Sequence, residues 1–196
     1  MNVPLAAELD PARLASLLGS GISADLVSRM LAVPRLEASC RRLLDRRIGV
    51  SAPALPPTAE AALSLDGLAL LALAHRAGAV WHAPLILSTI DGTAVRALVA
   101  AIGARARATA IRHAALAPPP EQGNALSPVA GQGSPLSAEM IAADGMASLA
   151  AWCESQPTGV GRRVMLRLPF SASVSIDDRY RRHAPPIVDA LLSEAG

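Results

Sequence analysis

The chain has 196 residues, of which 52% are hydrophobic and only 2% aromatic, and its formal net charge is +2. This length suits one domain, or one domain with a small appended unit, and it allows a sizeable core. Because aromatic residues are scarce, the core must consist of Ala, Leu, Val and Ile, which favours helices and excludes an ordinary all-β domain. All 18 basic residues are Arg, and 16 acidic residues are interspersed with them, so the single-sign field of a nucleic-acid binder is absent.

Helix signals punctuate the start of the chain. Asp10-Pro11 is typical of an N-cap followed by proline at the first helical position, and Gly19 ends this helix. Ser23 begins a second helix that Pro34 ends, and a third is predicted over residues 35–47. The predicted inward side chains of the third helix are Leu36, Cys40, Leu43 and Leu44.

The most apolar helix is predicted from Asp66 to about His82, and Pro84 ends it. Its near-continuous leucines imply burial on most sides, so it is the candidate central helix. Asp91-Gly92 opens a further helix, which Gly103 stops.

The next helix is predicted over residues 104–116. The pattern places Ile111 inward and three arginines on the exposed side, namely Arg105, Arg107 and Arg112.

A stretch rich in Pro, Gly and Ser then interrupts the helical pattern. Residues 118–135 are nearly devoid of charge and exceed the usual helix–helix connection, which predicts a flexible loop or linker. We therefore predict a helical unit over residues 1–117, a linker over 118–136, and a smaller helical unit over 137–196 that packs on the first.

Beyond the linker, helices are predicted from Ser137 to about Ser155 and from Pro186 to Glu194. Between them, residues 163–168 and 173–176 show partial alternation of apolar and polar side chains. The predicted fold class is therefore mainly α, an Ala/Leu-rich helical bundle or array with one or two short strands near residues 163–176.

No catalytic, nucleotide-binding or metal-binding motif is present in the sequence. His75 and His82 would stand about 10 Å apart on one helix, which is too far to share a metal ion. Asp177-Asp178 is interpreted as a helix N-terminus. Cys40 and Cys153 lack a neighbouring His and are interpreted as buried thiols in a reducing compartment. We therefore predict no catalytic residue, no cofactor and no metal.

The apolar segments are too short to span a membrane, which needs about 18–20 residues. The longest, residues 77–90, is interrupted by His82 and Pro84. The first residues lack a basic region followed by an apolar run, so no signal peptide is expected. We predict a cytoplasmic protein without direct membrane insertion.

Several stretches carry a family resemblance. The main ones are Leu9-Asp10-Pro11-Ala12-Arg13-Leu14, Gly78-Ala79-Val80-Trp81-His82-Ala83-Pro84, Ser88-Thr89-Ile90-Asp91-Gly92, residues 145–152, and Arg163-Val164-Met165-Leu166-Arg167-Leu168-Pro169. In these stretches the chain resembles the K-class adaptor of bacterial type III secretion systems, the YscK/PscK-like component of the sorting platform. The resemblance covers roughly half of the chain and leaves the linker and the tail after Phe170 without a counterpart.

The resemblance implies a non-enzymatic adaptor in the injectisome, an apparatus that serves virulence or symbiosis. Such an adaptor links the cytoplasmic domains of the inner-membrane ring to the cytosolic sorting platform. Its implied partners are the ring protein's cytoplasmic domain and a spoke or pod protein, with no nucleic acid. Its implied location is the cytoplasm, peripherally associated with the inner-membrane apparatus.

An adaptor needs surfaces, and arginine side chains are suited to acidic partner patches. We predict a protein-interaction surface that includes Trp81, His82, Arg96, Arg105 and Arg112. Core packing is the alternative interpretation of Trp81.

Two other functions remain as alternatives. The first is a helical nucleic-acid-binding regulator that uses the Arg clusters at residues 41–47 and 179–182. The second is a small enzyme with a dispersed site assembled from residues such as His82, Asp91 and His113.

Overall fold

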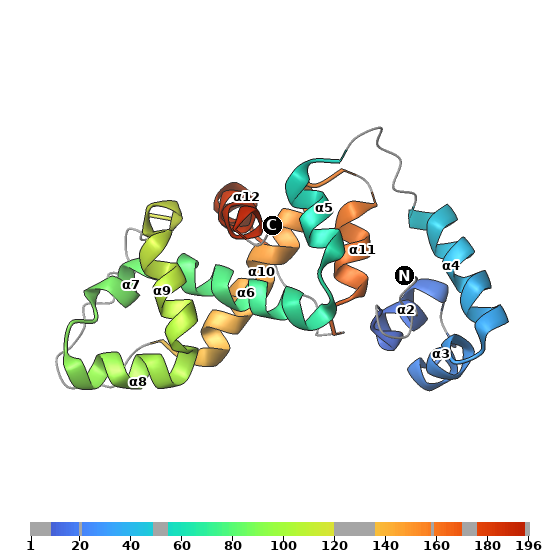
Figure 1. Ribbon diagram of the computed structural model, residues 1–196, viewed down its shortest axis with the longest axis horizontal. Helices are drawn as coiled ribbons and strands as arrows, with labels where there is room; N and C mark the ends of the chain where they lie inside the picture. The colour runs from blue at the N-terminus through green and yellow to red at the C-terminus, as the bar shows by residue number, and fades with distance from the viewer. Residues whose placement is uncertain are drawn as a thin grey trace. The chain divides into compact units, whose positions relative to one another are not determined.

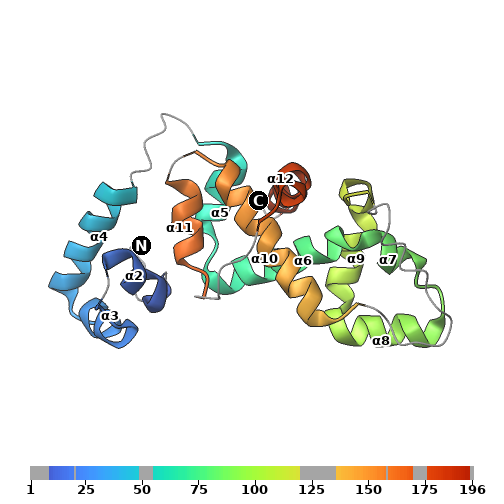
Figure 2. The same ribbon diagram turned by 180° about the vertical axis from the view of Figure 1, so that it is seen from behind.

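A computed structural model describes residues 9–19, 21–48, 55–119, 136–157, 159–169 and 176–194. These residues form helices and connections without a strand, which confirms the mainly α fold (Figures 1 and 2). The helices in chain order are α2 (Pro11–Leu18), α3 (Ala24–Leu31), α4 (Pro34–Ile48), α5 (Pro57–Ser64), α6 (Gly67–Trp81), α7 (Ala83–Ser88), α8 (Gly92–Ile102), α9 (Ala104–Arg112), the 3₁₀ turn η1 (Ala114–Leu116), α10 (Ala138–Ser155), α11 (Val160–Leu166) and α12 (Asp178–Ser193).

The predicted helix starts are confirmed by side-chain caps. In each, a side-chain oxygen accepts a hydrogen bond from a backbone N–H two or three residues ahead, and the capping residues are Asp10, Ser23, Asp91 and Asp177. Gly19 and Gly103 follow α2 and α8 with φ angles of 138° and 86°, a conformation that favours glycine. Local signals therefore set these helix ends.

The predicted strand over residues 163–168 is wrong. Arg163–Leu166 belong to α11, in which Val160 and Val164 are buried one turn apart on the same face. The spacing of four residues from Val160 to Val164, and from Val164 to the buried Leu168, is typical of one face of a helix and outweighs the partial alternation. The other predicted strand, residues 173–176, lies almost entirely outside the described residues.

Prolines begin two short helices that the sequence did not predict, and they misled the predicted start of a third. Helices α5 and α7 are short elements that begin with proline in the first turn, where the missing N–H is not needed. Helix α12 starts at Asp178 and runs through Pro185 and Pro186, although the sequence predicted a start at 186. The Asp177 cap and the apolar face that follows the prolines hold this helix together.

Several side chains differ from their predicted exposure. Ile111, predicted inward, is 41% exposed, and Leu36 and Leu43 of α4 are also partly exposed. Arg107, predicted exposed, is half-buried, and its Nε is buried without a hydrogen-bond partner among the described residues. Cys40 is buried as predicted.

The chain forms two compact units, and each draws on both halves of the sequence. Unit 1 comprises Met1–Leu71 and Cys153–Ser173, and unit 2 comprises Ala72–Trp152 and Val174–Gly196. This division differs from the one expected at residues 118–136, because its limits fall within α6 and α10. Residues 120–135, the bulk of the expected linker, lie outside the described residues, as do residues 1–8 and 51–54.

The core of unit 1 joins α2, α3 and α4 to the end of α11. Its buried residues are Leu14, Ala15, Val27, Leu31, Cys40, Leu44, Ile48 and Leu166. The Asp10 backbone N–H donates to the Leu166 carbonyl at 2.8 Å, and the Arg13 Nε donates to the Leu168 carbonyl at 2.8 Å. The end of α11 is thus tied to the start of α2 by apolar and polar contacts.

The Arg167 guanidinium is a second link within unit 1. Its Nη1 donates to the carbonyls of Leu63 and Leu65 at 2.5 and 2.7 Å, at the C-terminal end of α5. A cation at this place satisfies carbonyls that have no partner within the helix. The Leu-Arg-Leu-Pro segment of the family resemblance therefore has a structural role.

In unit 2, α6 crosses α10 at two glycines. A Cβ at Gly78 would overlap the carbonyl oxygen of Ile141, and a Cβ at Gly145 would overlap the carbonyl oxygen of Ala74. The two backbones can approach this closely only because both positions lack a side chain. The core of unit 2 also contains a cluster of buried residues from α6, α7, α8, α9 and α10, which runs from Ala79 to Ile141.

Candidate interaction surface

The five residues predicted for partner binding all belong to unit 2 but not to one site. Trp81 and His82 lie at the end of α6, Arg96 lies on α8, and Arg105 and Arg112 lie on α9. Four of them lie in two polar clusters, one around Trp81 and His82 and one around Arg112. Arg96 stands apart from both, exposed, with its Nη2 donating to the Thr93 hydroxyl at 3.1 Å.

The first cluster packs the start of α12 against the end of α6. The Trp81 and Tyr180 rings stack with their centroids 4.4 Å apart, and the Arg179 guanidinium lies 5.2 Å from the Trp81 ring centroid. Stacked rings with a cation over one face are a favourable arrangement. Trp81 is only 6% exposed. Its geometry agrees with the packing interpretation, and a partner could reach its ring only if the neighbouring side chains moved.

Asp144 of α10 joins His82 to Tyr180. Its Oδ2 lies 2.5 Å from the His82 Nε2, and its Oδ1 accepts from the Tyr180 hydroxyl at 2.7 Å. Because a carboxylate can only accept, the His82 Nε2 carries the donated proton. The three side chains connect α6, α10 and α12 through one carboxylate.

The electrostatics of this carboxylate favour its charged form. Burial raises the pKa of Asp144. The opposing effect is larger, because hydrogen bonds from His82 and Tyr180 and the charges of His82 and Arg179 all lower this pKa, which therefore lies below its ordinary value. Burial, together with the Asp144 carboxylate, raises the pKa of Tyr180. Both shifts keep Asp144 ionised and Tyr180 protonated at neutral pH, the states that their hydrogen bond requires.

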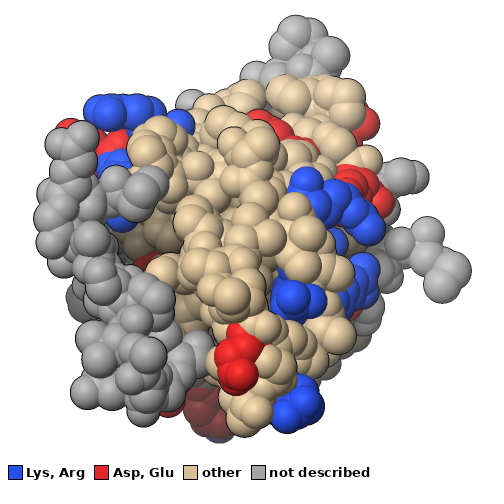
Figure 3. Space-filling view, turned by 90° about the vertical axis from the view of Figure 1, so that its left-hand side faces the viewer, with Lys and Arg blue, Asp and Glu red and all other residues tan. Residues whose placement is uncertain are grey.

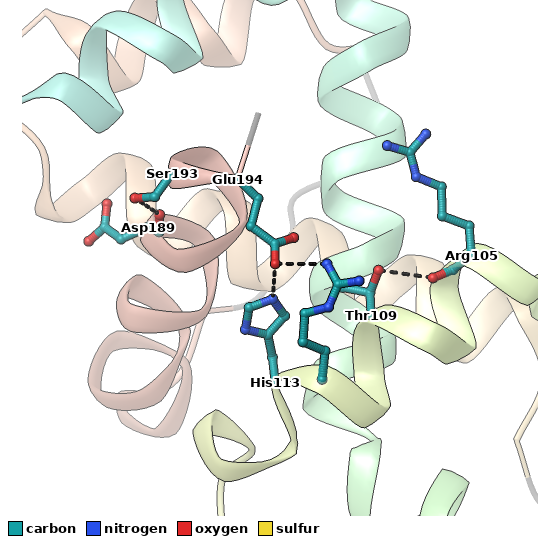
Figure 4. A network of polar contacts seen from close by, with 7 residues as sticks. Arg105, Thr109, His113, Asp189, Ser193 and Glu194 are labelled. Carbon is teal, nitrogen blue, oxygen red and sulfur yellow. Dashed lines mark hydrogen bonds and ion pairs between the residues drawn. The ribbon is translucent and has the colours of Figure 1, made fainter. Parts of the chain in front are cut away.

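The second cluster lies where α9 meets the end of α12. Arg112 Nη1 and His113 Nε2 each donate to the Glu194 Oε1 at 3.0 Å, and Figure 4 shows both donors converging on this one oxygen. The Arg112 hydrogen bond is the main reason that the pKa of Glu194 lies below its ordinary value. The Arg112 side chain is nevertheless 67% exposed, so the ion pair faces solvent.

Arg76 of α6 belongs to the same region. Burial lowers the pKa of Arg76, the charge of Arg105 lowers it further, and the charge of Glu194 opposes both effects. Arg105 is exposed and extends from α9 two turns before Arg112. The region therefore carries more positive than negative charge.

Figure 3 shows unit 2 from the side on which α7, α8 and α9 lie. Uncharged side chains cover the middle of this face, Arg side chains gather on its right-hand side with Asp or Glu side chains beside them, and a further Arg group lies at the upper left. Charged side chains of both signs thus surround a largely uncharged area.

The remaining polar groups of interest have structural partners. The His75 Nε2 donates to the Ile102 carbonyl at 2.9 Å, and the Trp152 Nε1 donates to Asp189 at 2.8 Å. Both cysteines are buried free thiols, and burial raises the pKa of Cys153 to about 12. In the described ranges, no group of three His, Cys, Asp or Glu side chains could hold a metal ion.

None of the described helices combines the length and the apolar character that a membrane crossing requires.

Sequence reasoning missed Asp144, Tyr180 and Glu194, because their partners lie 36 to 82 residues away. One signal was available for Asp144. It stands as a single carboxylate in an uncharged stretch of α10 between Glu139 and Glu154, which is typical of a side chain with a buried partner. Glu194 gives no such signal.

The fold and the site together define a helical protein of two units, whose polar clusters join helices and whose α9 bears exposed arginines. The family model "YOP proteins translocation protein K (YscK)" matches residues 43–191. The nodulation protein NolU of Rhizobium fredii is 31% identical over 178 residues, which cover 86% of this chain and 74% of NolU. NolU of Sinorhizobium fredii strain NBRC 101917 / NGR234 gives the same values. No solved structure matches.

The chain belongs to the YscK family, which confirms the family resemblance. The expectation that residues 118–135 and the tail after Phe170 lack a counterpart is wrong, because the family model runs through residue 191. It is a type III secretion-associated protein, and the family is a non-catalytic one.

Proposed function

We propose that this chain is a non-enzymatic adaptor of a type III secretion injectisome. It links the cytoplasmic domains of the inner-membrane ring to a spoke or pod protein of the cytosolic sorting platform. It acts in the cytoplasm, peripherally associated with the inner-membrane apparatus. Membership of the YscK family carries this proposal.

The exposed arginines of unit 2 support an adaptor role. Arg96 and Arg105 are exposed and pair with no carboxylate among the described residues. Exposed guanidinium groups of this kind can form charge-assisted hydrogen bonds to acidic side chains of a partner.

The alternative of a dispersed enzyme site has little support. His82 donates to Asp144, Asp91 caps α8, and His113 donates to Glu194. Each of the three side chains has its own structural partner, and no described contact joins one of them to another. A catalytic group needs to face a substrate together with its neighbours.

The nucleic-acid alternative is weakened in a similar way. Arg179 stacks over Trp81 and donates to the Pro119 carbonyl, and Arg181 pairs with Asp178. In the other cluster, Arg41 pairs with Glu37. Arginines engaged in this way are less available for phosphates.

The test is recovery of partners from cells that express the whole secretion cluster. A tagged chain should co-purify with both the ring protein and the spoke or pod protein, and should sediment with the inner membrane only when the ring protein is present. Arg105→Glu should reduce the recovery of one partner, whereas the matched reversal Arg182→Glu, on an exposed arginine of α12, should not. Failure of the unaltered chain to recover either apparatus protein would refute the adaptor role.

A further inference from the structure

The α9 cationic surface comprises Arg76 of α6, Arg105 and Arg112 of α9, and His113 after α9. Helices α6 and α9 contain no Asp or Glu. Within the described residues, Glu194 at the end of α12 is the one carboxylate that pairs with this surface, through Arg112 and His113.

Two of its arginines form no ion pair of their own among the described residues, although the charge of Glu194 acts on Arg76. The side chains of Arg76 and Arg105 make no hydrogen bond or ion pair among the described residues, although the Arg105 charge acts on the partly buried Arg76. Like charges held together in this way are unfavourable, and a nearby anion would stabilise both. The surface is therefore incompletely neutralised by the chain itself.

We propose that the α9 cationic surface binds an acidic segment of a partner protein, and that Glu194 competes with this segment by occupying Arg112 and His113. The biological role of this binding rests on the proposed adaptor function. The binding itself follows from the residues of the surface.

The spacing of the arginines suits two carboxylates. Arg105 and Arg112 lie on the same face of α9, two turns and about 10 Å apart. In a peptide with the polyproline II conformation, carboxylates three residues apart lie on the same side and are separated by about 9 Å. Each guanidinium can then form the bidentate pair that arginine makes with a carboxylate.

The chemistry favours a protein over a nucleic acid. The α9 cationic surface contains no Phe, Tyr or Trp side chain, whereas single-stranded nucleic acids are bound by stacking of bases on such rings as well as by charge. Its positive charge is also local, because the chain as a whole carries a formal net charge of only +2.

Glu194 is positioned to be displaced. The carboxylate is 30% exposed and Arg112 is 67% exposed, so solvent screens their ion pair. A segment with two or more carboxylates would contact Arg76 and Arg105 in addition to the groups that Glu194 holds. The incoming segment thus gains contacts that Glu194 does not make.

The proposal can be tested with a defined probe. A fluorescein-labelled peptide of Gly, Ala and Ser with Glu at every third position is titrated with the purified full chain, and fluorescence anisotropy is measured at low and at physiological ionic strength. A peptide with Gln in place of Glu is the control. The variants are Glu194→Gln and Arg105→Gln. Their matched controls, Glu139→Gln and Arg182→Gln, make the same charge changes at exposed residues of unit 2 without a described partner.

We expect the Glu peptide to bind and the Gln peptide not to bind. Glu194→Gln should strengthen binding about two- to fivefold, the range that release of one exposed ion pair allows. Arg105→Gln should weaken binding about three- to tenfold. The two control variants should match the unaltered chain, and circular dichroism should show the same helix content for all.

Three results would overturn the proposal. They are equal binding of the Glu and Gln peptides, unchanged or weaker binding by Glu194→Gln, and tighter binding of an oligothymidine that depends on Arg105. The peptide assay needs no secretion apparatus. If the peptide binds but the co-purification fails, the adaptor role is refuted and the binding of acidic segments is retained. If the co-purification succeeds but the peptide does not bind, only the proposed binding surface is refuted.

Discussion

The crossing of α6 and α10 makes Gly78→Ala a demanding test of the fold. The added methyl group would overlap the Ile141 carbonyl oxygen and stand 2.9 Å from the Gly145 amide nitrogen. These neighbours are backbone atoms, so they cannot rotate away as a flexible side chain could. The two helices must therefore separate.

The expected change in the free energy of unfolding follows from two opposing effects. Overpacking a core costs about 1–3 kcal/mol, and we take the upper end because the obstacle is backbone. Alanine is favoured over glycine within a helix by about 0.5–1 kcal/mol, which offsets part of this cost. The net loss is about 2 kcal/mol. For a chain of this length it corresponds to a fall in Tm of about 4–8 °C.

The assay is thermal unfolding followed by circular dichroism at a helical wavelength. Gly92→Ala is the matched control, because it also places alanine in a helix of unit 2 but meets only the Arg96 side chain at 3.8 Å. It should be neutral or slightly stabilising. A Gly78→Ala protein with an unchanged or higher Tm would refute the close crossing.

Three further predictions concern single side chains. Arg167→Gln should lower the free energy of unfolding by about 1–3 kcal/mol in denaturant titrations, because two carbonyls lose their donor, whereas the exposed Arg162→Gln should not. Asp144 has a lower pKa in the folded than in the unfolded chain, so its stabilising contribution is complete above the unfolded pKa and is lost as pH falls through the folded value. Asp144→Asn should therefore destabilise the protein at pH 7 and reduce the fall in Tm on acidification. An unchanged dependence of Tm on pH below neutrality would contradict the lowered pKa of Asp144. Cys40 and Cys153 should resist an aromatic disulfide reagent at pH 8 in the native protein and react once it is unfolded, because both thiols are buried with raised pKa values.

Local signals determined much of this protein. The N-caps Asp10, Asp91 and Asp177 were predictable because each accepts from backbone N–H groups only two or three residues ahead. The helical class followed from Ala and Leu with few aromatic residues. Family membership was also recognisable in the sequence, since the motifs around Trp81 and Arg167 could be compared directly with known members.

Only the tertiary structure decided the partners of the charged residues. Asp144 meets His82 across 62 residues of chain, and Glu194 meets Arg112 across 82, and no local pattern encodes such distances. The same holds for Arg105, whose unpaired charge is evident only beside Arg76. Helix formation depends on neighbours in the chain, whereas the neutralisation of a charge depends on neighbours in space, which packing brings together.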